Sequence, residues 1–404
     1  MGFAFKRQKG MLHSRNFRLA VVLFIATIGF SFLDTFWSIY IDGFVKNAAL
    51  VGFVSSFLAF ISFISFFLIV PFIEKYDKAK TFAISLFLIA ISYFVFAITS
   101  NFYLFLLIAI IVTVFHSLRI TSFGIMIKDG SLKKELCVNE GIVYTFINLA
   151  WLLGPLVAGL LSNYFDISII FGLSGFFILV SLIYFLFLRI HEEEAMKRVD
   201  KNVVKLFFDF FRCKRRVVAY MLGGGVSFWW SLIYIFVPVY MVESGLDVSY
   251  VGYFLFAVAI PLISLSYFFS RITGKVGFKK IFKIGFFIPF LASLICFFVP
   301  SIYVILLVLI VASVGLAMLE PTVEAYFFDN LKGKEDLRFY GPYNTTIDVS
   351  HFISRMVGGV VLLFFPFKYI FLFFSFSMLV FLLLSFMTLN INESRRKEEK
   401  KKKR

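Results

Sequence analysis

HEEEAMKRVDKNVVKLFFDFFRCKRR, residues 191–216, is the longest charged stretch between two apolar runs of the chain. Six apolar runs precede it and six follow it, and each is close to the roughly 20 residues that cross about 30 Å of hydrocarbon as an α-helix. Because the runs are continuous and do not alternate with polar residues, they predict helices rather than the strands of a membrane barrel. The runs cover residues 17–41, 48–72, 81–99, 102–127, 141–161, 169–188, 217–242, 248–269, 281–299, 302–328, 341–365 and 369–391.

The composition supports a membrane protein divided at this stretch. Hydrophobic residues make up 61% of the 404 residues, whereas soluble domains contain about half. We predict an all-α membrane protein with twelve transmembrane helices in two pseudo-symmetric six-helix bundles, residues 1–190 and 217–391. Residues 191–216 are expected to be a cytoplasmic linker, either with an amphipathic helix on the membrane surface or fully solvated. Residues 392–404 form a basic cytoplasmic tail.

The net charge of +16 is distributed as expected for a membrane protein. With a cytoplasmic N-terminus, all of the 40 Lys and Arg residues except Lys46, Lys368, Arg119 and Arg355 fall on the cytoplasmic side. This positive-inside bias predicts that both termini are cytoplasmic. The same bias explains the basic tail, whose positive charges fix the topology and attract anionic lipids. We therefore expect no nucleic-acid partner. We predict a multi-pass protein of the plasma membrane, monomeric, with a small-molecule substrate, protons and lipids as its partners.

The two halves of the sequence resemble each other at a constant offset of 200 residues. Internal duplication is typical of transporters, because two similar halves can rock about a site between them. The matching pairs are Tyr40 and Tyr240, Asp129 and Asp329, Glu135 and Glu335, Gly141 and Gly341, and Gly159 and Gly359.

Two matching basic loops lead to a family. EKYDKAK (residues 74–80) and GKVGFKK (residues 274–280) follow the second and eighth apolar runs. With the twelve-span layout, they give the chain a resemblance to the major facilitator superfamily over essentially its whole length. That family's loop signature is G-x-x-x-D-R-x-G-R-K, which both copies match in part. The resemblance implies a gating role on the cytoplasmic side for Glu74, Lys75, Lys78, Lys275, Gly277 and Lys279.

The fifth apolar run resembles the antiporter motif of the same family, G-x8-G-x3-G-P-x2-G-G. Two of the motif's glycines are alanine here, and small residues at this spacing also occur in ordinary close helix packing. The resemblance points to the drug:proton antiporter-like branch. The matching residues are Gly141, Ala150, Gly154, Pro155, Ala158 and Gly159.

Several ionisable residues interrupt the apolar runs. Each costs at least about 2.5–3.5 kcal/mol at the bilayer centre, so such groups pair with one another or face a watery cavity. The family resemblance implies that spans one, four, seven and ten surround that cavity, with spans five and eleven between the halves. The candidates for proton coupling or substrate binding are Asp34, His116, Arg119, Glu320, Asp348, His351 and Arg355.

Two interpretations of these charges stay open. In the first, Asp34–Arg119 and Glu320–Arg355 are static ion pairs that hold helices together. In the second, a carboxylate exchanges its arginine for a proton or a substrate, because a moving arginine changes the affinity of the carboxylate for a proton. Histidine titrates near physiological pH and suits the same task.

Aromatic residues in the first and seventh spans are candidates to line the cavity. Trp37 falls in the first span, three residues after Asp34, and Trp230 and Tyr234 fall in the seventh. With carboxylates nearby in the fold they could hold an organic cation, because aromatic faces attract cations. The chain also contains 60 Phe, so aromatic residues are equally expected to fill lipid-facing positions. Two buried arginines would suit an organic anion.

The sequence contains no nucleophile–base pair, metal-ligand spacing or phosphate-binding loop, so we expect no enzyme, no cofactor and no metal site. The function that these features favour is secondary active transport of a small organic solute by alternating access, as proton-coupled efflux (antiport). The alternatives are proton-coupled uptake or facilitated transport of a small metabolite or organic anion. A receptor or scaffold on the same fold that does not transport is the third.

Overall fold

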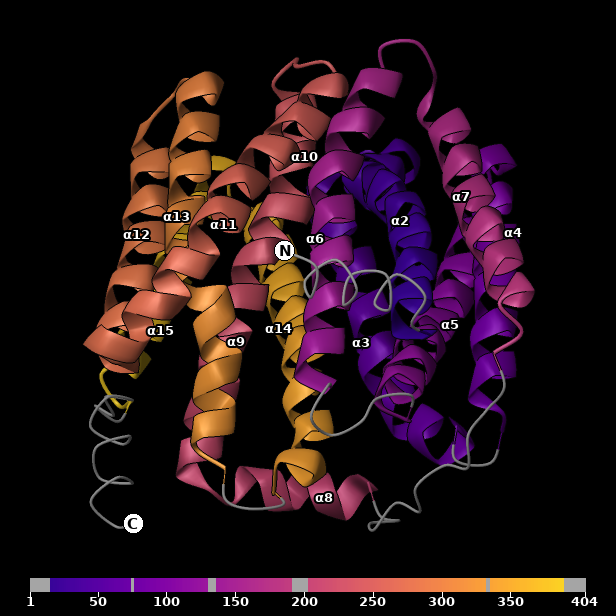
Figure 1. Cartoon of the computed structure of the whole chain (residues 1–404). Coiled ribbons are helices and arrows are strands. Elements are labelled where there is room, and N and C mark those ends of the chain that lie inside the picture. Colours follow the sequence, from indigo (N-terminus) through magenta and orange to yellow (C-terminus); the bar gives the residue numbers. More distant parts are fainter. Residues whose placement is uncertain (1–14, 74–75, 130–135, 191–202, 332–334, 389–404) are drawn as a thin grey trace, which may run out of the picture. The chain divides into compact units, whose positions relative to one another are not determined.

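The computed structural model describes residues 15–73, 76–129, 136–190, 203–331 and 335–388, and every regular element in these ranges is a helix (Figure 1). The first helices are α2 (Arg15–Val45), α3 (Ala48–Ile73), α4 (Lys78–Ile98), α5 (Phe102–Asp129), α6 (Leu136–Leu161), α7 (Ile167–Phe187) and α8 (Val203–Phe211). They are followed by α9 (Lys214–Ser231), the π-helix η1 (Leu232–Phe236), α10 (Val237–Glu243), α11 (Ser249–Val276), α12 (Phe278–Phe298), α13 (Ile302–Asp329), α14 (Glu335–Phe364) and α15 (Lys368–Ser385).

Twelve spans among the described residues are long and apolar enough to cross a membrane. The predicted all-α class is therefore confirmed. The seventh span, Lys214–Glu243, consists of α9, η1 and α10 in succession. In hydrocarbon a helix satisfies its own backbone hydrogen bonds, which is why long apolar runs form helices there.

By their contacts the helices form two compact units. The first comprises the described parts of Met1–Tyr40, Ile64–Lys201 and Val251–Tyr253. The second comprises the described parts of Ile41–Phe63, Asn202–Tyr250 and Phe254–Arg404.

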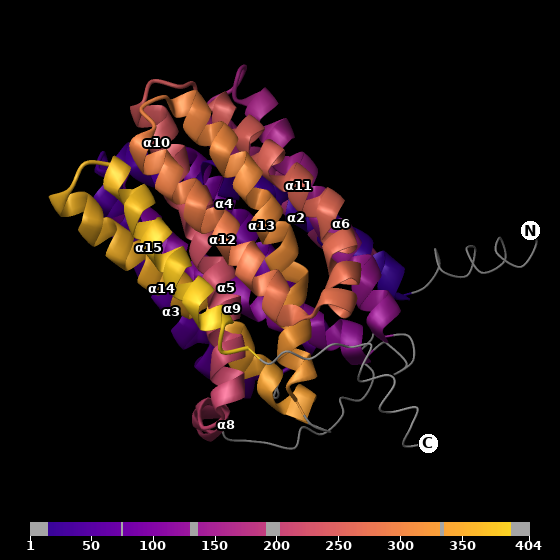
Figure 2. The same ribbon diagram turned by 90° about the vertical axis from the view of Figure 1, so that its left-hand side faces the viewer.

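The helices repeat at the offset that the sequence predicts. α4 and α12 begin at residues 78 and 278 and end at 98 and 298, and α5 and α13 run from 102 and 302 to 129 and 329. In the first unit α4 packs against α5 and α7. In the second unit the equivalent helix α12 packs against α13 and α15, which lie on either side of it (Figure 2). The duplicated sequence therefore folds twice into the same local arrangement.

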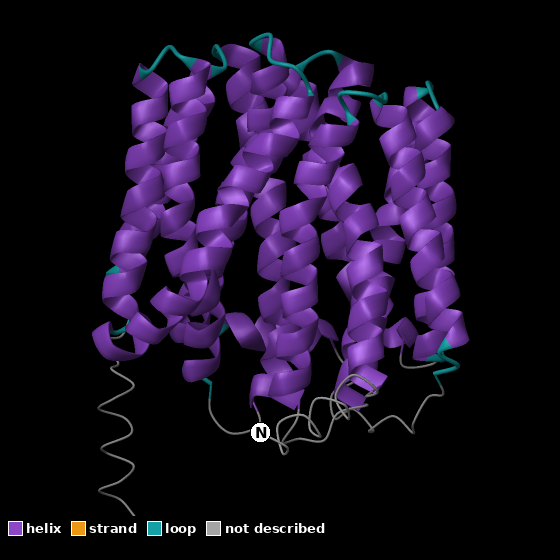
Figure 3. Cartoon of the chain, turned by 45° about the horizontal axis from the view of Figure 1, so that its top comes forward, coloured by secondary structure: helices purple, strands orange, loops and turns teal. Residues whose placement is uncertain are grey.

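Most of the described connections between the helices are short turns (Figure 3). Polar side chains fix some of the helix starts. The Asn47 side chain accepts a hydrogen bond from the Ala49 amide at 2.9 Å, and Asp77 accepts one from the Lys80 amide at 3.0 Å. Such side chains satisfy amides that have no partner within the helix. The chain turns between α11 and α12 at Gly277, whose φ of 89° lies in the region that favours glycine.

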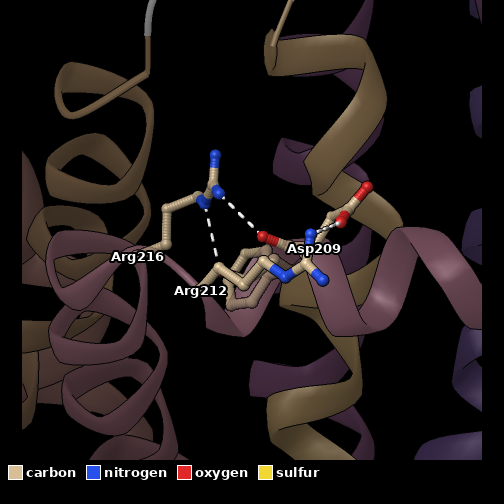
Figure 4. A network of polar contacts seen from close by, with 4 residues as sticks. Asp209, Arg212 and Arg216 are labelled. Carbon is tan, nitrogen blue, oxygen red and sulfur yellow. Dashed lines mark hydrogen bonds and ion pairs between the residues drawn. The ribbon is translucent and has the colours of Figure 1, made fainter.

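The short helix α8 falls within the predicted linker and is held at its C-terminal end by an arginine (Figure 4). Arg216 donates from Nη2 to the Asp209 carbonyl at 2.8 Å and from Nε to the Phe210 carbonyl at 3.1 Å. Its guanidinium also lies 3.9 Å from the ring centroid of Phe339. The last carbonyls of a helix have no intrahelical donor, and a cation stabilises that end. Residues 191–202 of the predicted linker lie outside the described residues, and its last residues, 214–216, already belong to α9.

Candidate functional site

In the first unit, Arg119 of α5 is almost completely buried, with 7% of its surface exposed. Its guanidinium carbon lies 4.2 Å from the ring centroid of Phe30 on α2, a distance typical of cation–π attraction. It also interacts electrostatically with Asp34 on the same helix α2. Asp34 was predicted as its partner from sequence, whereas Phe30 was not.

His116 lies one helical turn before Arg119 and joins the same cluster. Its Nε2 is 3.3 Å from the hydroxyl oxygen of Tyr93 on α4, within hydrogen-bonding distance. Its ring centroid is 4.6 Å from that of Phe30. The spacing of three residues predicts that His116 and Arg119 share a face of α5. Tyr93 carries no sequence signal that would single it out.

The second unit has a cluster around the acidic Glu320 on α13. The indole Nε1 of Trp230 donates a hydrogen bond to Glu320 Oε1 at 2.7 Å. The ring of Trp230 lies 5.5 Å, centroid to centroid, from that of Tyr234. Here the structure brings together three residues that the sequence proposed separately.

The remaining predicted charges of the second unit lie along α14. Asp348 interacts with the Ser62 hydroxyl and electrostatically with Arg355. Arg355 donates from Nη1 to the carbonyl oxygen of Ser55 on α3 at 3.3 Å. His351 interacts with Arg355 and with the backbone of α9 at residue 227.

One of the two ion pairs considered from sequence is not formed. Within the described part of the chain, Glu320 has no basic partner and accepts from Trp230 instead. Arg355 is engaged by groups of α3 and α14. Charge signs alone suggested the Glu320–Arg355 pair, but a neutral indole donor from α9 satisfies the carboxylate.

The offset of 200 relates the two clusters. Phe30 corresponds to Trp230, and Asp34 corresponds to Tyr234. In the first unit the aromatic residue faces the Arg119 cation. In the second its counterpart donates to the Glu320 anion. The equivalent aromatic residues therefore contact a cation in one unit and an anion in the other.

Trp37 and the antiporter-like motif have structural surroundings of their own. The Trp37 ring packs 5.6 Å from the Phe96 centroid and 5.5 Å from the Phe105 centroid, within an aromatic cluster. On α6, Gly154 lies directly against Ser31 of α2. Ala150 and Ala158 are fully buried, Pro155 lies inside the helix, and Gly141 lies near its start.

The predicted gating loops are described in part. Glu74 and Lys75 lie outside the described residues, whereas Lys78 is the first residue of α4. Lys275 lies in the last turn of α11, and Gly277 and Lys279 follow at the junction with α12. No group of three or more His, Cys, Asp or Glu side chains among the described residues is arranged to hold a metal ion.

Comparisons with known proteins agree with this fold. The Major Facilitator Superfamily model matches residues 19–301 and 219–404. A bicyclomycin resistance protein homolog of Haemophilus influenzae is 25% identical over 182 residues, which are 42% of this chain and 45% of that protein. An MFS-type transporter of Methanocaldococcus jannaschii is 21% identical over 361 residues, 87% of this chain and 92% of that protein.

Solved structures show the same architecture. The crystal structure of the nucleoside transporter NupG superposes with a TM-score of 0.74 at 13% identity, over 92% of this chain and 98% of that one. At such low identity the likeness concerns the fold alone. The chain belongs to the major facilitator superfamily, as its loops and its twelve spans predict. It is an integral multi-pass membrane protein of a transporter family and not an enzyme.

Proposed function

We propose that the protein is a secondary active transporter that moves a small organic solute out of the cell in exchange for protons. The observation that carries this proposal is the cluster of Asp34, Arg119 and His116 on membrane-spanning helices, with Tyr93 and Phe30 around it. Buried charges at such positions are costly and mark transport or proton pathways.

The cluster has the chemistry that coupling requires. Arg119 gains stabilisation from the Phe30 ring as well as from its electrostatic interaction with Asp34. A guanidinium with an aromatic partner can move from the carboxylate without losing all of its stabilisation. The carboxylate then binds a proton more readily, because a nearby cation favours its ionised form. Alternating between these two arrangements couples proton movement to solute movement.

The wider organisation follows from the same proposal. The halves 1–190 and 217–391 rock about the solute, and the basic loops brace the cytoplasmic side closed. The antiporter-like residues of α6 support exchange rather than uptake, as does the similarity to a bicyclomycin resistance protein homolog. The protein acts as a monomer in the plasma membrane, with lipids around it and both termini in the cytoplasm.

Transport by the purified protein in liposomes tests the proposal. We expect a solute from a panel of organic cations, sugars and organic anions to accumulate against its gradient when a pH gradient is imposed. Collapse of the pH gradient with a protonophore should abolish that accumulation.

Other results would favour the alternatives. Uptake with protons in the same direction would identify a symporter, and flux without any pH dependence would identify facilitated transport. Arg119 would then serve as an anion ligand, since a guanidinium binds carboxylates and phosphates well. Absence of flux for every solute would favour a receptor or scaffold role.

A further inference from the structure

The seventh span shows an unusual exposure pattern near its middle. Every residue from 222 to 239 is buried except Trp230 and Tyr234. Both rings are partly exposed and lie 5.5 Å apart, centroid to centroid, with their planes inclined by 50°. One side of this span therefore carries two partly exposed aromatic side chains.

The π-helix η1 carries Tyr234 in this pair. Pro238 has no N–H to donate to the Tyr234 carbonyl, as an α-helix would require. The Val237 amide donates to the Leu232 carbonyl, five residues back, and this bond defines the wider turn. Such π turns are rare and are frequent at functional sites.

The tenth span adds a carboxylate to the same side. From residue 315 to residue 323, Glu320 and Pro321 are the two residues that are not buried. The 2.7 Å hydrogen bond from Trp230 fixes Glu320 beside the aromatic pair. In the described part of the chain Glu320 has no cationic partner.

The other charges of the second unit do not neutralise this group. Arg355 interacts with Asp348, His351 and the Ser55 carbonyl. Glu324, one turn after Glu320, is acidic as well and accepts from the Tyr340 hydroxyl at 3.0 Å. The site at Glu320 thus has a formal negative charge and two partly exposed rings.

These features discriminate between ligands. A metal ion would need several oxygen ligands, and the described residues provide no such group. A proton alone would neutralise the carboxylate but would give the two aromatic rings no role. An organic cation uses both, because a carboxylate attracts its charge and aromatic faces attract cations and cover apolar surface.

We propose that Glu320, Trp230 and Tyr234 form a binding site for an organic cation with a bulky apolar or aromatic body. This inference rests on the proposed function, since it names the class of solute that the transporter carries. Glu320 pairs with the cationic centre, and Trp230 both orients the carboxylate and contacts the body of the ligand. Tyr234 contributes its ring on the second side.

Binding of radiolabelled tetraphenylphosphonium to the purified full-length protein in detergent tests the site. Tetraphenylborate has nearly the same size and shape with the opposite charge and serves as the control ligand. We expect saturable binding of the cation and none of the anion. Glu320→Gln should lower the affinity for the cation at least tenfold while keeping an acceptor for the Trp230 indole. Trp230→Phe should lower it several-fold.

A control variant makes the result specific. Glu324→Gln removes a carboxylate from the same helix, one turn away, and should leave the affinity unchanged. Tyr234→Ala removes the second ring of the site and should bind more weakly. Elution as a monodisperse protein and an unchanged melting temperature establish that each variant is folded.

The outcomes separate this inference from the proposed function. Absence of saturable cation binding by the wild-type protein, or equal affinity in folded Glu320→Gln, overturns the site even when proton-driven transport is observed. Glu320-dependent binding without proton-driven accumulation supports the site and refutes coupled efflux.

Discussion

Gly252 at the start of α11 lies against Gly159 of α6 so closely that a Cβ at position 252 would come within 2.6 Å of the Gly159 Cα. The offset of 200 relates this contact to a second one. Gly52 of α3 lies against Gly359 of α14, where a Cβ would be 3.1 Å from the Gly359 Cα. Both contacts fall within single compact units. The duplication has therefore preserved a glycine-to-glycine contact, and not merely four separate glycines.

Gly252→Ala should destabilise the protein, because the new methyl group meets backbone atoms that cannot rotate away. Such overpacking costs about 1–3 kcal/mol. We expect a lower apparent melting temperature in detergent and slower solute exchange in liposomes. Gly52→Ala should have a smaller effect, since its contacts are 3.0 Å or longer.

Gly124→Ala provides the matched control within α5. A Cβ there would meet nothing within 4 Å. Alanine is also favoured over glycine inside a helix by roughly 0.5–1 kcal/mol, so this variant should melt at the wild-type temperature or above it. Equal melting temperatures for Gly252→Ala and Gly124→Ala would contradict the close contact.

Much of the fold could be predicted from sequence because membrane helices leave a simple signal. A continuous apolar run of this length has few alternatives to a transmembrane helix. The offset of 200 was equally visible, and the ends of α4 and α12 follow it. The contact between Gly159 and Gly252 could not be predicted, because small residues in a sequence indicate close packing but do not identify the helix that approaches them.

The candidate site could be predicted less completely. Spacing along α5 places His116 and Arg119 on one face, but it does not identify the residues opposite. Phe30 and Tyr93 therefore emerged only from the packing of α2 and α4 against α5. One of the two alternatives paired Glu320 with Arg355, and this pairing is wrong. Charge complementarity ignores neutral donors such as the Trp230 indole, which donates to Glu320.

Arg216→Ala should loosen α8 without unfolding the membrane helices. It removes two hydrogen bonds from a charged donor to the carbonyls of Asp209 and Phe210. Hydrogen bonds to charged groups contribute roughly 1.5–3 kcal/mol each when buried, and less at this partly exposed site. Faster hydrogen exchange of the α8 amides, measured by mass spectrometry, is the expected result.

Arg212→Ala is the appropriate comparison for that variant. Arg212 pairs with Asp209 at 3.2 Å, but its side chain is 81% exposed. Exposed ion pairs contribute about 0–1 kcal/mol, so exchange in α8 should hardly change. Equal exchange in the Arg216 and Arg212 variants would show that Arg216 does not hold the helix end.

Labelling of single cysteines in intact cells tests the predicted topology. In a background with Cys137, Cys213 and Cys296 replaced by serine, an impermeant reagent should react with a cysteine at Asn47 and not with one at Lys402. Because the Asn47 side chain caps α3, a cysteine there removes that cap, and a second external position serves as a check. Tyr164, 82% exposed between α6 and α7, meets that need. Labelling of the cysteine at position 402, with none at positions 47 and 164, would show that the topology is the reverse of the predicted one.

Asp34→Asn should uncouple the transporter from protons. The counterpart of Asp34 at the offset of 200 is Tyr234, so at this position only the first unit carries an acidic group. If Asp34 alternates between Arg119 and a proton, the neutral amide mimics the protonated state. Accumulation driven by a pH gradient should then be lost. Exchange of labelled solute at equal concentrations on both sides should survive.

A static ion pair predicts a different result for the same variant. Asparagine would leave the buried Arg119 without its electrostatic partner, and breaking a buried pair costs about 3–5 kcal/mol. Accumulation and exchange would then disappear together, with a fall in melting temperature. The cation–π contact with Phe30 limits that cost, so a stable variant is attainable.

Asp166→Asn is the control, because Asp166 lies at an exposed helix start and makes no side-chain cap. It should leave accumulation, exchange and the melting temperature unchanged. Full accumulation by folded Asp34→Asn would remove this carboxylate from the mechanism and make Glu320 and Asp348 the next residues to replace.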